Sequence, residues 1–158
     1  MSGCITLNGG GTAARWGDRL CLQFMSTPRA VRRALLGMRE HYERRLGPGQ
    51  SLDLVETVLA EALNNIGEHA YTPAAPGRVE MHLSRIGDGL AVELRDRGAA
   101  MPGGRVPRGG LPPEGALPPE GGFGWFLIRT LAEDLRYCRH GDENRLHLLV
   151  SLRKDKTW

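Results

Sequence analysis

A glycine- and proline-rich segment at residues 97–122 sets the strongest limit on how this chain can fold. It contains a repeated hexad, LPPEGA at 111–116 followed by LPPEGG at 117–122. Such a composition cannot form a helix or a central strand. Because regular patterns occur on both sides, the segment belongs inside a domain rather than between two. Loops of this length inside compact domains are usually functional or disordered, and we expect a lid over a ligand at 97–121.

Periodic patterns on both sides of this segment predict helices and strands. A compact apolar run at 20–25 predicts a strand. Ser26-Thr27-Pro28 is typical of a helix start, and Ser51 of a helix cap. Gly87-Asp88-Gly89 is typical of a hairpin turn. The expected helices lie at 28–46, 51–71 and 123–132, and the further strands at 78–86, 90–96, 134–139 and 145–152.

This order predicts an α/β (α+β) two-layer sandwich. Sequence-adjacent strands with clustered rather than alternating helices indicate a mixed, mostly antiparallel sheet, covered by about three helices. A chain of 158 residues is long enough to bury a sizeable core as one domain. We expect that domain at 20–152, a flexible segment or an edge strand at 1–19, and a polar tail at 153–158.

Charge and hydropathy exclude several classes of function. The net charge is +3, and acids and bases are interspersed without a basic block that contains aromatic residues. We therefore expect no direct nucleic-acid binding. No apolar run approaches the ~20 residues that span a bilayer, and the N-terminus lacks the pattern of a signal peptide. These features favour a cytoplasmic protein without membrane contact.

The predicted helix at 51–71 carries the first candidate site. Its apolar residues gather on one side, while Glu61, Asn65 and Glu68 gather on another, since residues three and four apart share a helix face. An amide oxygen at Asn65 is a suitable ligand for Mg²⁺ beside substrate phosphates. A carboxylate one turn away, at Glu61, can act as a general base. His69, near the helix end, is expected to be structural.

Two further motifs have the chemistry of a nucleotide site. In Asp96-Arg97-Gly98, the carboxylate can accept a hydrogen bond from an exocyclic amine, and the glycine allows a ring to approach the backbone. Gly122 and Gly124 open the helix at 123–132, where free backbone N–H groups can hold a phosphate. Arg105, within the lid, is a candidate for neutralising phosphate charge. Each motif alone is common in proteins; their order, with the lid between the last two, is more specific.

Together these motifs resemble the GHKL ATP-binding superfamily, and within it the small anti-sigma-factor serine/threonine kinases of bacterial partner switching. The resemblance covers about residues 20–152. The stretch EALNNIGEHAY, at 61–71, is similar to the family's N box. Asp96 and Gly98 match its first glycine box, and Gly122, Gly124, Leu127 and Ile128 match its second.

The resemblance implies a Bergerat-type fold that binds ATP and Mg²⁺. It implies Glu61 as the base, Asn65 as the Mg²⁺ ligand, and Asp96 as the reader of the adenine amino group. It further implies transfer of the γ-phosphoryl group to a serine or threonine of a STAS-domain anti-anti-sigma partner. Competing binding of a sigma factor, often by a homodimeric kinase, is also implied.

The chain departs from the family pattern at three places, which leave an alternative open. Ala100 replaces the usual second glycine of the first box, Trp125 and Phe126 are bulkier than usual, and the lid repeat is not a family feature. We expect Trp125 and Phe126 in the core. The alternative is a non-catalytic GHKL module that sequesters a regulator with or without ATP. The arginines of the helix at 28–46 are either solvated or a docking surface for an acidic partner.

Overall fold

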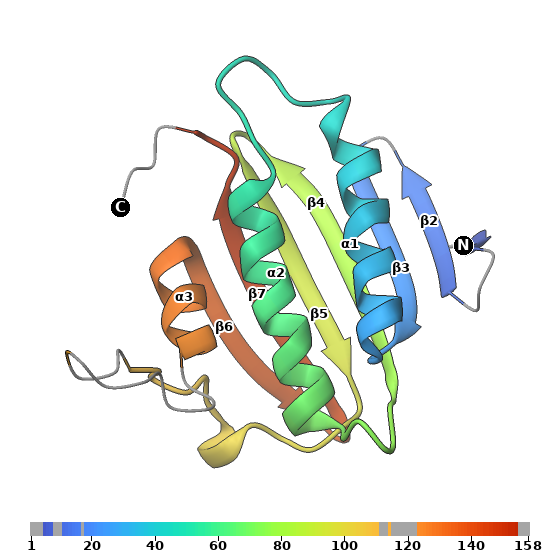
Figure 1. The fold of residues 1–158 in the computed structure, drawn as a ribbon, viewed down its shortest axis with the longest axis vertical. Helices are drawn as coiled ribbons and strands as arrows, with labels where there is room; N and C mark the ends of the chain where they lie inside the picture. The colour runs from blue at the N-terminus through green and yellow to red at the C-terminus, as the bar shows by residue number, and fades with distance from the viewer. Residues whose placement is uncertain (1–4, 8–10, 17, 111–113, 115–122, 155–158) are drawn as a thin grey trace.

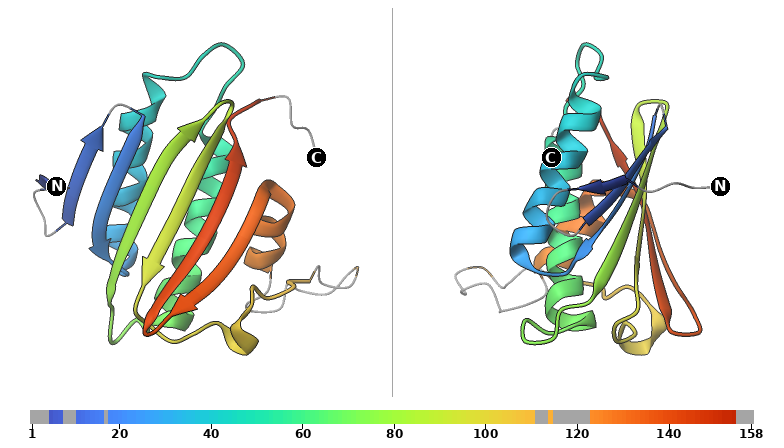
Figure 2. Two further views of the ribbon diagram at one scale, coloured as in Figure 1. Left: turned by 180° about the vertical axis from the view of Figure 1, so that it is seen from behind. Right: turned by 90° about the vertical axis from the view of Figure 1, so that its right-hand side faces the viewer.

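The structure is a computed structural model that describes residues 5–7, 11–16, 18–110, 114 and 123–154. Within these residues, seven strands form one sheet, and three α-helices cover one of its faces (Figures 1 and 2). The strand order is β1-β2-β3-β4-β5-β7-β6. The strands are β1 (Ile5–Leu7), β2 (Gly11–Trp16), β3 (Arg19–Met25), β4 (Arg78–Ile86), β5 (Gly89–Asp96), β6 (Ala132–His140) and β7 (Glu143–Ser151).

The two-layer α/β fold is confirmed, with one difference in the sheet. Every pairing between neighbouring strands is antiparallel, so the sheet is not mixed. β5 and β6 do run in the same direction, because each pairs antiparallel with β7. However, β7 lies between them, so the two parallel strands that are joined through the third helix are not hydrogen-bonded to each other.

The helices are α1 (Pro28–Glu43), α2 (Asp53–Asn65) and α3 (Phe123–Leu131), and α2 continues as a π-helix at Ile66–Ala70. α1 begins as predicted: Thr27 Oγ1 accepts a hydrogen bond from Ala30 N at 3.3 Å, and Pro28 is the first helical residue. Ser51 does not occupy the cap position of α2, which belongs to Leu52. Ser51 Oγ instead accepts from Asp53 N at 3.1 Å, one residue outside the cap.

The N-terminal part of the chain forms strands at the edge of the sheet. β1 pairs with β2, and β2 pairs with β3. An edge strand was one of two expectations for residues 1–19, but the second strand, β2, was not predicted. Its sequence, GTAARW, has no clear alternation of polar and apolar residues. At the other end, Arg153 forms a bridge with Gln50, and residues 155–158 lie outside the described part of the chain.

The core lies between the sheet and the helices. The inward-facing residues of the central strands, such as Met81 and Leu94, are almost fully buried, as are Met38 of α1, Leu59 of α2 and Ile128 of α3. Burial of this apolar surface is the main favourable term in folding. It fixes α2 between α1 and α3, which positions the polar face of α2 against α3 (Figure 1). None of the helices among the described residues combines the length and apolar character needed to cross a membrane.

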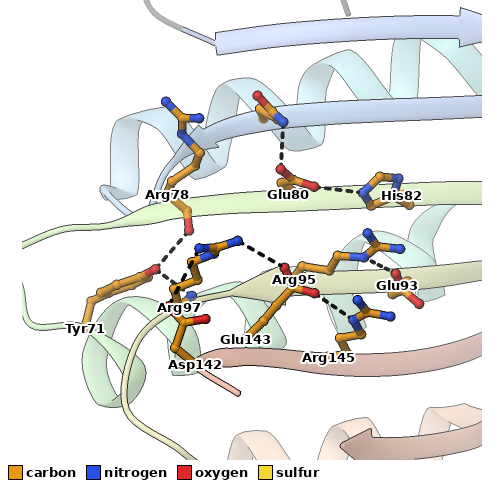
Figure 3. A network of polar contacts seen from close by, with 11 residues as sticks. Tyr71, Arg78, Glu80, His82, Glu93, Arg95, Arg97, Asp142, Glu143 and Arg145 are labelled. Atoms are coloured by element: carbon orange, nitrogen blue, oxygen red, sulfur yellow. Dashed lines mark hydrogen bonds and ion pairs between the residues drawn. The ribbon is translucent and has the colours of Figure 1, made fainter. Parts of the chain in front are cut away.

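The opposite face of the sheet is polar and is not covered by helices (Figure 2). Alternate residues of the strands form polar contacts there, both within one strand and between strands, as Figure 3 shows. Gln23 Nε2 donates to Glu80 Oε1 at 2.7 Å, and Arg145 Nε donates to Glu143 Oε1 at 2.7 Å. This alternation of buried and polar residues explains why the strands could be predicted from sequence.

Candidate functional site

The polar face of α2 meets the first turn of α3, where Glu61, Asn65 and Gly124 come together. A Cβ atom placed on Gly124 would lie 2.6 Å from Glu61 Oε2 and 3.7 Å from Asn65 Nδ2. The first distance is too short for two non-bonded atoms, so with Glu61 in this position only glycine fits at 124. The structure therefore brings together three residues that the sequence singled out in two separate motifs.

Asn65 has a buried polar atom without a partner. Its Nδ2 atom is inaccessible to solvent and makes no hydrogen bond to any residue that the structure describes. A buried amide left in this state costs stability, and such groups are rare unless a ligand, ion or water satisfies them. The side chain of Asn65 is therefore available for a polar ligand.

The helix changes its winding at the same place. α2 ends at Asn65 and continues as a π-helix at Ile66–Ala70, whose closing bond runs from Tyr71 N to Ile66 O at 3.0 Å. Single π-helical turns occur frequently at functional sites. Gly67 allows this turn to pack on the start of α1, because a Cβ there would lie 2.9 Å from Ser26 O.

A cavity of about 630 Å³ opens beside this helix end. A volume of this size is typical of a site for a small molecule. Its wall is mainly apolar, with few polar groups, and its polar members include Asn65, Asp96 and Asn144. The remaining lining residues are Ala62, Ile66, His69, Ala70, Ala99, Ala100, Met101, Pro102, Pro107, Trp125, Tyr137 and Leu146.

Asp96 is the buried acid of this cavity, with 6% of its surface exposed. Its Oδ1 atom accepts hydrogen bonds from Gly98 N and from Asn144 Nδ2, both at 2.8 Å. Burial raises the pKa of the Asp96 carboxyl, and these two donors oppose that rise. The other carboxylate oxygen accepts no hydrogen bond from the described residues, which leaves it free for a ligand that donates one.

Gly98 has a packing role that the sequence did not indicate. A Cβ there would lie 2.2 Å from Ala70 O, so the glycine is required for packing against the end of the π-helix. Its expected role in the approach of a ring stays a prediction. Ala99 N donates to the same Ala70 O at 2.7 Å. The first glycine box thus joins the end of β5 to the end of the π-helix and closes one side of the cavity.

The described part of the lid, residues 97–110, begins along the cavity. Ala100 lines it, and no residue other than glycine among those described has a positive φ. Position 100 therefore does not need the conformational freedom of glycine, and the left-handed conformation occurs instead at Gly103 and Gly104. Arg129 ties this part to α3, donating to Val106 O at 2.8 Å and to Pro107 O at 2.7 Å.

Of the predicted site residues, Asn65 and Asp96 line the cavity, and Glu61, Gly98 and Gly124 are chain neighbours of lining residues. The structure does not place Arg105 and Gly122 at the cavity. Arg105 lines another hollow, of about 770 Å³, which shares Tyr137 with the cavity and is also lined by Arg108, Arg129, Arg136 and His147. Its predicted role toward phosphate stays a prediction. Gly122 lies outside the described residues, as does the hexad repeat except Glu114.

The cavity also contains residues that sequence reasoning missed. Asn144 and Tyr137 were not singled out, and His69, expected to be structural, lines the wall. Asn144 is the register partner of Asp96 across β5 and β7. This pairing joins strands that are not neighbours in sequence, so no local pattern signals it. Trp125, expected in the core, is buried and also forms part of the wall.

A nucleotide with a divalent cation fits these residues. The buried Asn65 Nδ2 atom is a donor without a partner among the described residues, which suits a phosphate oxygen, whereas Asn65 Oδ1 is the amide atom that could bind a cation. Asp96 presents a free acceptor, and Gly124 leaves room beside Glu61 that any side chain would fill. The chemistry also agrees, because Mg²⁺ prefers oxygen ligands and is usually held by one or two protein groups together with phosphates.

Comparison with known proteins identifies the family. The family model described as the histidine kinase-like ATPase domain matches residues 24–150. No curated protein matches the chain significantly. Among solved structures, the Acinetobacter baumannii histidine kinase AdeS is similar with a TM-score of 0.43 and 15% identity, over 82% of this chain and 67% of that chain. Because the family match spans β3 to β7, with the cavity and all three helices, this chain belongs to the histidine kinase-like ATPase domain family.

Proposed function

We propose that this protein is an ATP-dependent serine/threonine protein kinase that acts as an anti-sigma factor. It phosphorylates a STAS-domain anti-anti-sigma partner and sequesters a sigma factor. The observation that carries the proposal is the contact of Glu61 and Asn65 with Gly124, next to the cavity that contains Asp96. The sequence resemblance to the anti-sigma-factor kinases favours serine or threonine as the acceptor.

In this proposal, each residue has a separate task. Asp96 accepts a hydrogen bond from the adenine amino group, and the apolar wall excludes water from the base. Asn65 would hold Mg²⁺, which supplies positive charge to the phosphates. Glu61 accepts the proton of the serine or threonine hydroxyl as that oxygen bonds to the γ-phosphorus. The bond from phosphorus to the bridging oxygen breaks, and ADP leaves.

Substitution of Glu61 tests this assignment. Glu61→Gln keeps the size of the side chain and removes its basicity, so we expect ATP binding to persist and phosphoryl transfer to fall by about 10²–10⁴-fold. The measurement is transfer of labelled phosphate from ATP to a STAS-domain protein, with calorimetry for ATP. Glu68→Gln is the matched control, because Glu68 is exposed in the adjacent turn. Undiminished transfer by the Glu61 variant would refute Glu61 as the base.

The second candidate is a module that binds a regulator without catalysis. It is favoured by the unusual lid sequence and predicts a stable complex with a sigma factor but no phosphate transfer to any STAS partner. Incubation of the wild-type protein with ATP, Mg²⁺ and both partners separates the two functions. Complex formation without labelled product would select the binding module.

A further inference from the structure

A buried network surrounds the carboxylate that faces the cavity. Asn144, which is 4% exposed, lies at its centre. Its Nδ2 atom donates to Asp96 Oδ1 at 2.8 Å and lies 3.3 Å from Gly98 O and 3.0 Å from Ala99 O. Its Oδ1 atom accepts from Tyr137 OH and from an Arg139 guanidinium nitrogen, both at 2.6 Å. The polar atoms of the Asn144 amide are therefore all engaged within the protein.

The network fixes the direction of every hydrogen bond in it. An arginine side chain only donates, so the atom of Asn144 facing Arg139 must be the oxygen. Backbone carbonyls only accept, so the atom facing Gly98 O and Ala99 O must be the nitrogen. With both ends determined, Asn144 can only donate to Asp96. Asp96 Oδ1 then receives donors from Asn144 and Gly98, which favours the ionised carboxylate despite its burial.

We infer that Asn144, oriented by Arg139 and Tyr137, is the positioning residue that keeps Asp96 a hydrogen-bond acceptor and thereby selects a purine with an amino group at C6. The inference rests on the proposed binding of a nucleotide in this cavity. Adenine presents an amino group at C6, which donates to the free oxygen of Asp96. Hypoxanthine and guanine present a carbonyl there, which would meet a buried carboxylate with no proton between them. A site built to pair a donor discriminates strongly against a ligand that lacks it.

The variant Asn144→Leu removes the amide donor and keeps a branched side chain. Asp96 Oδ1 then retains one donor, Gly98 N, in the same buried place, so the protonated carboxyl is favoured more than in the wild type. A protonated Asp96 can donate through its free oxygen to a C6 carbonyl, and selectivity for adenine is lost.

The experiment compares the dissociation constants of ATP and inosine triphosphate, whose bases differ at C6 and in protonation of the neighbouring nitrogen. Calorimetry on the full chain with Mg²⁺ is expected to show at least about tenfold preference of the wild type for ATP. In Asn144→Leu we expect this ratio to fall by about tenfold. The control is Asn64→Leu, the same change at an exposed position of α2, which should keep the wild-type ratio. General damage to the site would weaken both nucleotides equally and leave the ratio unchanged.

Arg139→Gln provides a second variant at an exposed position, so folding is expected to be kept. Glutamine can donate or accept, which weakens one of the contacts that orient Asn144 while the carbonyls of Gly98 and Ala99 remain, and should lower the ratio in the same direction, by a smaller factor. An unchanged ratio in folded Asn144→Leu and Arg139→Gln would overturn the inference while the proposed kinase function stands. A wild-type protein that binds neither nucleotide would overturn both.

Discussion

Single residues in this site combine functional value with a cost in stability. Asp96 is the clearest case, since its carboxylate is buried and one of its oxygens has no hydrogen-bond partner among the residues that the structure describes. Burial raises its pKa, so the folded protein retains a proton on this group at pH values where the unfolded chain has released it. Ionisation of Asp96 therefore destabilises the folded state as the pH rises.

Asp96→Asn is expected to weaken ATP binding without weakening the fold. The amide loses the free acceptor for an amino group, which should reduce ATP affinity by at least about tenfold, the value of one hydrogen bond to a charged group. The unfolding free energy of the variant relative to wild type should increase as the pH rises from the ordinary carboxyl pKa of about 3.9 toward the raised value. Denaturant unfolding at several pH values checks this. A variant that loses stability as the pH rises would contradict the pKa assignment.

Gly124→Ala is expected to separate stability from catalysis. The added Cβ would lie 2.6 Å from Glu61 Oε2, the end of a flexible side chain that can move away. Alanine favours the helix by up to about 1 kcal/mol, which offsets the cost of moving the Glu61 side chain. The melting temperature should therefore change little. A displaced Glu61 should reduce phosphoryl transfer by about 10²-fold. Gly37→Ala, in α1, is the matched control, because the nearest atom to its Cβ is Leu22 Cδ1 at 4.0 Å. Full transfer activity of Gly124→Ala would contradict the proposal that catalysis depends on the close approach of Gly124 to Glu61.

At the scale of elements, the site depends on where helix and strand ends meet. The end of β5, the π-helix at Ile66–Ala70 and the first turn of α3 surround one cavity. The joint between β5 and the π-helix is close, because Gly98 has no side chain and Ala99 N bonds to Ala70 O. Arg129 and Tyr137 hold the described part of the lid beside it, through hydrogen bonds to Val106 O and from Met101 N.

Gly98→Ala is expected to destabilise this joint. The new methyl group would lie 2.2 Å from Ala70 O, a backbone atom that cannot move alone. Overpacking and loss of the neighbouring hydrogen bond should together lower the unfolding free energy by about 2–4 kcal/mol. Gly110→Ala is the control, since nothing lies within 4 Å of its Cβ and its φ is not in the left-handed region. Equal melting temperatures for both variants would show that the joint can relax.

At the scale of the whole molecule, one core positions all these ends. The sheet and its helices bury a continuous set of apolar side chains, and the polar face of α2 is presented to α3 only because its apolar face is held by this core. The opposite face of the sheet remains polar (Figure 3). The site should therefore respond to changes in the core that never touch a ligand.

Leu59→Ala is expected to lower the unfolding free energy by about 2–5 kcal/mol, the usual cost of a cavity at a fully buried leucine. Leu36→Ala is the matched control, because Leu36 is a helical leucine with 49% of its surface exposed. We expect its effect to stay within about 0.5 kcal/mol. Chemical denaturation of both variants provides the comparison, and a similar loss in the two would contradict the assigned core.

The elements could be predicted closely because their signals are local. Alternation in β4 and β5, the Thr27-Pro28 start of α1 and the turn at Gly87-Asp88-Gly89 each lie within a few residues. β2 was not predicted because its sequence has no clear period. The prediction of a mixed sheet was wrong, because the strand order depends on which strands pair after the crossover. The π-helix was predicted only as part of a helix, since its winding depends on packing against Ser26 and Gly98.

The sequence by itself determined the layers, the elements, and the candidates Glu61, Asn65, Asp96 and Gly124, because periodicity and motif spacing are properties of the chain. Only the tertiary structure decided which of them meet. Asn144 lies beside Asp96 because β5 pairs with β7, and Gly98 packs against Ala70 O. Both contacts join distant segments, and such contacts follow from the packing of the core. Residues that orient a site across a sheet leave no local pattern, so their function is visible only in the fold.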